Sequence, residues 1–177
     1  KAAAALDILD TVEPGMWTLG QLGASIHGNP GMRLMLEHHA LLYQDLMDPV
    51  ALLQDRSNTE LRKFWSYVDP QTSNQNSATM YSELMAQSQT MICDNILSAA
   101  SLSSHHNLLD LGGGLGVFAS AALGRNPQLR ATVVDLPKVI ECAACRENIF
   151  GERLKFVTKD MFSEDIPIGS DIISLVR

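Results

Sequence analysis

The feature that most restricts the fold is an apolar run that ends in an acid and opens into glycines. Residues 108–116 read LLDLGGGLG, which predicts a buried strand ending near Asp110. Glycine tolerates positive φ and leaves backbone amides uncovered, so Gly112, Gly113 and Gly114 predict a loop that a ligand can approach closely. The alternative is a tight strand-to-helix turn that needs small residues only for packing.

The spacing of the glycines separates this loop from two common nucleotide-binding loops. A dinucleotide-binding GxGxxG that begins at Gly112 would need a glycine where Val117 stands. A phosphate-binding GxxxxGK[ST] would need a lysine that the loop lacks. The remaining pattern is an acid followed by GxGxG, with its acid at Asp110.

Two further predicted strands also end in an aspartate. Residues 131–135 and 155–160 are short β-branched or apolar runs that close on Asp135 and Asp160. Ligands of open parallel sheets bind outside the carboxyl ends of the strands, so these acids and Asp110 are expected in one crevice. Carboxylates there can accept hydrogen bonds from ligand hydroxyl and amino groups. The alternative is three solvated loop acids.

These motifs together resemble those of class I S-adenosylmethionine (SAM) methyltransferases. The segments LLDLGGGLG, VVDLPKVI and LKFVTKDMF are similar to successive motifs of the small-molecule O-methyltransferases, which include plant phenolic and bacterial polyketide and carotenoid enzymes. The DLP after the second strand is typical of that family. The resemblance implies an α/β fold with a partial Rossmann-like sheet, and SAM as the cofactor.

The resemblance also implies which residues hold the cofactor. It places Gly112 to Gly114 at the methionine part of SAM, Asp135 at the ribose, and Asp160 with Met161 at the adenine. A helix predicted from residue 80 to about residue 100 would lie along the methionine end, although its methionines also suit core packing. The implied cofactor-binding residues are Asp110, Gly112, Gly113, Gly114, Asp135, Leu136, Asp160, Met161, Met85 and Ser88.

The chain divides by pattern into three parts. Residues 1–68 are mainly helical and winged-helix-like, residues 69–79 form a polar connection, and residues 80–177 form the Rossmann-like SAM-binding domain. At the start we expect a helix over residues 2–9, a turn at Pro14-Gly15 and then a strand. In the family this region mediates dimerisation, so the resemblance implies a homodimer.

The substrate is suggested by the amino-terminal region. The strings GMWTLGQLG and HHALLYQDLMDPVALL resemble the corresponding region of carotenoid 1-hydroxy O-methyltransferases and of related bacteriochlorophyll methyltransferases. The resemblance implies a small apolar hydroxylated substrate, such as hydroxyneurosporene. A bacteriochlorophyll-type, phenol or polyketide acceptor remains open. Two other classes also remain, an NAD-dependent oxidoreductase and a non-catalytic SAM-binding or dimerisation fragment.

The sequence supplies no catalytic residue. In the family a His-Asp pair containing the general base follows the fourth strand, whereas this sequence stops at residues 171–177, which read as that strand. None of the five histidines stands at that position; they are His27, His38, His39, His105 and His106. We therefore expect these residues to be part of a longer enzyme and to be inactive alone.

Charge and cysteine spacing limit the other functions. A net charge of −7 without a long basic run argues against a nucleic-acid surface, and residues 1–30 contain a single Lys or Arg, which is Lys1. No apolar stretch has membrane-spanning length and no signal peptide is recognisable, so a cytoplasmic protein is expected. Cys142 and Cys145 lack the second pair of a zinc site, and we expect small buried thiols and no metal.

Overall fold

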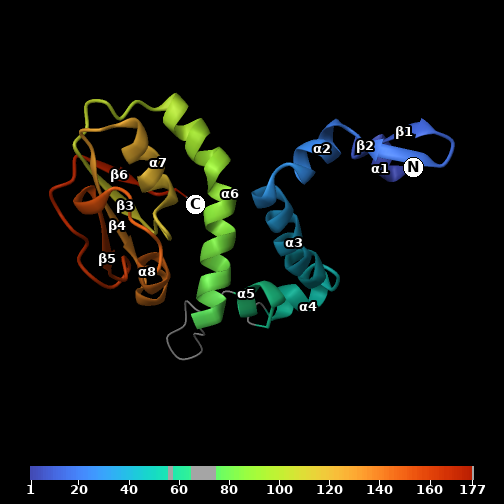
Figure 1. Cartoon of the computed structure of the whole chain (residues 1–177). Helices are drawn as coiled ribbons and strands as arrows, with labels where there is room; N and C mark the ends of the chain where they lie inside the picture. The colour runs from blue at the N-terminus through green and yellow to red at the C-terminus, as the bar shows by residue number, and fades with distance from the viewer. Residues whose placement is uncertain (56–57, 65–74, 177) are drawn as a thin grey trace.

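The computed structural model describes residues 1–55, 58–64 and 75–176. It shows two parts (Figure 1): an arm of short helices and one hairpin, made of residues 1–55 and 58–64, and a sheet-containing body, made of residues 75–176. In chain order the elements are α1 (Ala2–Ala5), β1 (Leu9–Glu13), β2 (Met16–Leu19), α2 (Gln21–His27), α3 (Pro30–Asp45), α4 (Pro49–Gln54), α5 (Glu60–Phe64), α6 (Gln75–Ala99), β3 (Asn107–Leu111), α7 (Val117–Arg125), β4 (Arg130–Asp135), α8 (Pro137–Ala144), the 3-10 turn η2 (Gly151–Arg153), β5 (Leu154–Thr158) and β6 (Ile172–Ser174).

The body is a four-stranded parallel sheet with strand order β5-β4-β3-β6. Its two central strands, β3 and β4, carry buried apolar residues on both faces, as is typical of a parallel sheet covered by helices. Leu108 and Leu109, on opposite faces of β3, are each 1% exposed. Helices α7 and α8 pack on the strands, and α6 packs on both helices. This arrangement confirms the α/β, partial Rossmann-like fold expected from the sequence.

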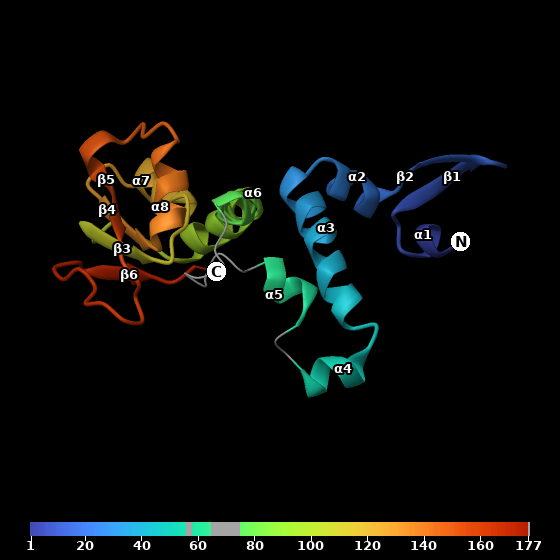
Figure 2. The same cartoon turned by 90° about the horizontal axis from the view of Figure 1, so that it is seen from below.

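Helix α6 lies on the side of the body that faces the arm in Figure 1, and it is seen nearly end-on in Figure 2. It begins at residue 75, so the predicted polar connection over residues 69–79 is wrong for residues 75–79. Residues 69–74 lie outside the described residues. Polar residues such as Gln75 and Asn76 have only modestly lower helix propensity than apolar ones, and a helix that is already nucleated downstream extends through them.

The predicted amino-terminal helix over residues 2–9 is also wrong beyond α1. Asp7 has a φ of 55°, which ends the helical path, and the following residues form the hairpin of β1 and β2. The predicted turn at Pro14-Gly15 and the strand after it are present, with Gly15 at a φ of 84°. The missed strand β1 is the partner that this turn needs.

The arm meets the body where α3 approaches α6. Asn29 caps α3 by accepting a hydrogen bond from the Met32 amide at 3.1 Å, and Pro30 occupies the first helical turn. Gly31 is buried, and a Cβ atom there would overlap the Gln87 carbonyl of α6. The backbones of α3 and α6 therefore approach closely at Gly31.

The two clustered cysteines depart from the prediction of small buried thiols. Cys142 is half-buried in α8, with its Sγ 3.2 Å from Thr79 Oγ1. Cys145 is exposed, because α8 ends at Ala144 and Cys145 is its C-cap. Within the described residues, neither cysteine forms a disulfide.

Candidate cofactor site

The glycine loop follows β3 and turns the chain into α7. Gly112, Gly114 and Gly116 have φ values of 65°, 60° and 75°, a region that side chains with a Cβ rarely adopt. The Gly112 amide donates to the Val134 carbonyl at 2.8 Å, which ties the loop to β4. No heavy atom lies within 4 Å of a Cβ built on Gly114, so the loop faces open space there.

Asp110 lies beneath this loop. Its side chain is 1% exposed, and a Cβ on Gly113 would overlap its Oδ2. The hydroxyl of Ser174 donates to Asp110 Oδ1 at 2.6 Å, because β3 and β6 place the two residues opposite each other in parallel register. Asp110 Oδ2 is buried without a hydrogen-bond partner in the described part of the chain.

The surroundings of Asp110 favour its protonated form. Burial raises the pKa of this carboxyl from 3.8 to about 6, since a charged group is poorly solvated there, and the nearby Asp135 raises it further. The Ser174 hydroxyl and the backbone N–H of Ala119, in the first turn of α7, oppose the rise, because N–H and O–H donors favour the charged carboxylate.

Asp135 ends β4 and is bonded to the loop. Its Oδ2 accepts from the Gly114 amide at 2.8 Å, and its Oδ1 accepts from the Leu136 amide at 2.7 Å. Burial raises the pKa of Asp135, and the two amide donors lower it. Each carboxylate oxygen has two lone pairs, so one position on each remains for a ligand hydroxyl.

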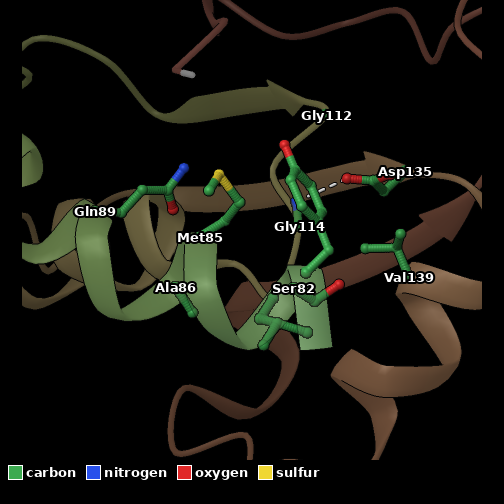
Figure 3. Close-up of a pocket in the computed structure, with 10 residues that line it drawn as sticks. Ser82, Met85, Ala86, Gln89, Gly112, Gly114, Asp135 and Val139 are labelled. Atoms are coloured by element: carbon green, nitrogen blue, oxygen red, sulfur yellow. Dashed lines mark hydrogen bonds between the residues drawn. The ribbon is translucent and has the colours of Figure 1, made fainter. Parts of the chain in front are cut away.

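A pocket opens between this loop and α6 (Figure 3). The dashed line in the close-up joins Gly114 to Asp135, and the side chains of Ser82, Met85 and Gln89 enter the view from α6. The lining residues are Tyr81, Ser82, Met85, Ala86, Gln89, Gly112, Gly114, Leu115, Asp135 and Val139.

Four of the ten residues expected from the sequence line this pocket: Met85, Gly112, Gly114 and Asp135. Sequence reasoning missed the lining roles of Ser82 and Gln89. They lie three residues before and four residues after Met85, so the helical period could have found them. Gln89 also donates from Nε2 to the Val176 carbonyl at 3.2 Å, which connects α6 to the segment after β6.

Other expected residues lie beside or behind the pocket. Gly113 faces Asp110 on the side of the loop away from the pocket, and Leu136 is the N-cap of α8. The Ser88 hydroxyl donates to the Met85 carbonyl at 3.0 Å and is not part of the lining.

The two residues expected at the adenine follow β5. The Asp160 carboxylate accepts hydrogen bonds from Phe162 and Ser163 in its own turn, which lowers its pKa, and Asp160 is not part of the pocket lining. Met161 does approach the loop, since its Cε lies 3.2 Å from a Cβ built on Gly112. The adenine role of both residues stays a prediction.

The residues present fit a cofactor that carries hydroxyls and positive charge. The glycine cradle leaves open space at Gly114, Asp135 offers acceptor positions, and Asp110 holds a buried oxygen that lacks a partner. Among the described residues, no group of three or more His, Cys, Asp or Glu side chains could hold a metal ion. Nor, in the same residues, is any helix both long and apolar enough to cross a bilayer.

A parallel sheet with a strand, an acid-GxGxG loop and a helix, and a second acid bonded to that loop, defines a Rossmann-like cofactor-binding domain of the SAM methyltransferase class. The O-methyltransferase domain family matches residues 43–177. The chain belongs to this O-methyltransferase family, whose cofactor is SAM.

Individual relatives agree with the family. The chain is 37% identical over 179 residues to the demethylspheroidene O-methyltransferase of Rhodobacter capsulatus, covering 100% of this chain and 44% of that protein. The enzyme of the same name from Cereibacter sphaeroides is 36% identical over 186 residues, covering 100% and 48%. The crystal structure of LaPhzM superposes with a TM-score of 0.70 at 25% identity, covering 97% of this chain and 53% of that chain. The chain thus spans about half the length of these relatives.

Proposed function

We propose that the whole protein transfers the methyl group of SAM to a hydroxyl of a small apolar molecule, and that the acceptor is a hydroxylated carotenoid such as hydroxyneurosporene. The observation that carries the methyltransferase proposal is the glycine cradle with Asp135 bonded to Gly114 at 2.8 Å. The carotenoid acceptor is supported by the similarity of the whole chain to two demethylspheroidene O-methyltransferases.

In this proposal the chain binds and orients the cofactor. SAM supplies an activated methyl group, because its positively charged sulfur is a good leaving group. The loop from Gly112 to Gly114, with Met85 and Ser88 nearby, holds the methionine end, while Asp135 with Leu136 accepts the ribose hydroxyls. Asp160 and Met161 belong to the adenine side. Asp110 supports the loop from below.

The acceptor hydroxyl has to be brought into line with the methyl group and to lose its proton. Among the described residues that line the pocket there is no His, Lys or Cys that could take this proton. We therefore assign no catalytic residue within the described part of the chain. The leucine and methionine side chains of the arm suit an apolar acceptor.

Acceptor assays decide between the remaining substrates. The complete protein is expected to methylate a hydroxylated carotenoid faster than a simple phenol or a tetrapyrrole. Preference for a phenol would contradict the carotenoid proposal, and SAM binding without methyl transfer to any of them would favour the non-catalytic alternative. Stronger binding of NAD(H) than of SAM would favour the oxidoreductase.

The proposal includes a homodimer formed through the amino-terminal region, and the cytoplasmic location expected from the sequence. The dimer is supported by apolar side chains that the arm leaves exposed. Tyr43, Met47 and Leu53 are 67%, 83% and 71% exposed. A second copy of the same surface would bury them.

The ribose assignment is tested by Asp135→Ala. Loss of two charge-assisted hydrogen bonds should weaken SAM binding by about 1.5 to 3 kcal/mol, measured by calorimetry. The control is Asp94→Ala, because Asp94 is an exposed aspartate of α6 that pairs with Arg125 at 2.8 Å, outside the pocket lining. Unchanged SAM affinity of the Asp135 variant would refute the assignment.

A further inference from the structure

The buried carboxylate of Asp110 is only half satisfied. Ser174 donates to Oδ1, whereas Oδ2 is buried and has no hydrogen-bond partner within residues 1–55, 58–64 and 75–176. Burying an ionisable group in this way destabilises a fold unless another partner compensates. An apolar residue on β3 would avoid that cost, so the acid at this position needs a reason beyond packing.

The position of Asp110 suggests what that partner is. The missing side chain of Gly113 lets the carboxylate lie directly beneath the loop that lines the pocket. Asp135, which also raises the pKa of Asp110, contributes a second carboxylate at the pocket wall. None of the ten described lining residues is Lys, Arg or His. The pocket therefore has a negative potential that a cationic ligand would offset.

We propose that Asp110 is a specificity-determining residue that makes the site prefer the cationic cofactor to its neutral demethylated product. This inference rests on the proposed function. SAM carries a sulfonium, an ammonium and a carboxylate, and thus a net charge of +1, whereas S-adenosylhomocysteine has lost the sulfonium charge. Binding of SAM to the protein with Asp110 protonated releases that proton to solvent and leaves an ionised Asp110 carboxylate beneath the loop that holds a cation. Binding of S-adenosylhomocysteine releases no proton from Asp110.

Several groups face Asp110 and affect its ionisation. They are Ser174 on β6, Asp135 at the end of β4, Cys93 on α6 and the amide of Ala119 on α7. Burial and the Asp110 charge raise the pKa of Cys93 to about 11, so this thiol stays neutral near pH 6. The charge of Asp135 raises the pKa of Asp110, although less than burial does. Ser174 bonds to Asp110 and not to Asp135, so a change at Ser174 identifies the Asp110 contribution.

The test is calorimetric titration of the full chain with SAM and with S-adenosylhomocysteine at pH 5 and pH 7, in two buffers of different ionisation enthalpy. An opposite charge nearby lowers a carboxyl pKa by about 1 unit or more, so the ratio Kd(S-adenosylhomocysteine)/Kd(SAM) should rise about three- to fivefold from pH 5 to pH 7. The buffer comparison should show proton release with SAM alone.

Two variants separate this role from a structural one. In Asp110→Asn the ratio should be equal at both pH values and the proton release should vanish, whereas Ser174→Ala should move the transition to higher pH because it removes a hydrogen bond that lowers the Asp110 pKa. The control Asp94→Asn should behave as wild type. A structural role would weaken both ligands equally, and should Asp110→Asn not fold, Ser174→Ala still decides.

The remaining outcomes distinguish a failure of the Asp110 inference from a failure of the cofactor assignment. A wild-type ratio that is independent of pH, or a pH dependence that survives in Asp110→Asn or is unmoved in Ser174→Ala, overturns the inference while SAM binding and methyl transfer stand. If neither ligand binds to the wild type, the cofactor assignment fails and this inference fails with it.

Discussion

The sheet body and the amino-terminal arm stabilise themselves in different ways. In the body, Leu108 and Val133 are at most 1% exposed and belong to one core that includes side chains of α6 and α7. Between residues 1 and 55 the buried positions are three glycines, while Trp17 and Met47 are 52% and 83% exposed. The body thus carries its own core, whereas the arm leaves its large apolar side chains exposed.

The largest effect should follow truncation of the core of the body. Leu108→Ala should lower the free energy of unfolding by about 2 to 5 kcal/mol, because it leaves a cavity between β3 and the helices α6 and α7 that share its core. The matched change Leu53→Ala, at a leucine of the arm that is 71% exposed, should alter it by less than about 0.5 kcal/mol at protein concentrations where the chain is monomeric. Urea unfolding followed by circular dichroism measures both changes. Equal losses of unfolding free energy would contradict the comparison, because they would show that the leucine of the arm is packed as tightly as the leucine of the body.

The buried acid of the body should give stability a specific pH dependence. Its pKa is raised from 3.8 to about 6, so the folded protein holds this proton more tightly than the unfolded chain does. The resulting stabilisation is complete below pH 3.8 and is lost as pH rises through 6. Relative to Asp110→Asn, the wild type should therefore lose about 3 kcal/mol between pH 3.5 and pH 7. Parallel pH profiles of the two proteins in urea unfolding would contradict this.

The glycine loop offers a smaller and more local test. In Gly113→Ala the new methyl group would overlap Asp110 Oδ2, which should cost about 1 to 3 kcal/mol of stability and weaken SAM binding. Gly124→Ala is the control, because no heavy atom lies within 4 Å of a Cβ there and the residue is inside α7. That control should gain up to about 1 kcal/mol. Thermal unfolding and SAM titration compare the two, and a neutral Gly113→Ala would mean that the carboxylate moves aside at little cost.

The smallest effect on folding, yet a clear one on assembly, is expected at the exposed surface of the arm. The double change Tyr43→Asp and Leu53→Asp should convert a dimer into a monomer in sedimentation experiments. At protein concentrations where the wild type is also monomeric, it should leave the free energy of unfolding within about 0.5 kcal/mol. Ile149→Asp, at an exposed isoleucine of the body, should leave the dimer intact. A wild type that is monomeric at tens of micromolar would refute the proposed dimer.

The sequence predicts the body well because its signals are local. The run around Leu109 and the β-branched residues of β4 indicate strands by themselves, and the φ values of Gly112 and Gly114 explain why the loop could be recognised from spacing. The start of α6 and the strand β1 were missed. The first turn of α6 consists of polar residues without apolar periodicity, so no pattern indicates a helix there. Strand β1 forms because it pairs with β2, and its own sequence pattern does not predict a strand.

The candidate site was predictable where one segment supplies it. Asp135 and the glycines lie at strand ends, where the topology of a parallel sheet directs attention. The bond between Ser174 and Asp110 depends on the register of strands 64 residues apart, which no local pattern contains. The sequence also grouped Asp160 with the other two acids, whereas its carboxylate is engaged in its own turn.

The contact between Gly31 and the Gln87 carbonyl concerns the spacing of the two halves of the molecule. Main chain rests on main chain there, so the separation of α3 from the pocket-lining helix is set by the absence of a single methyl group. Gln87 lies two residues from Met85 and from Gln89, both of which line the pocket. The distance between the arm and the pocket therefore depends on the residue at position 31. A Gly31→Ala substitution would push α3 away from α6 and so increase that distance.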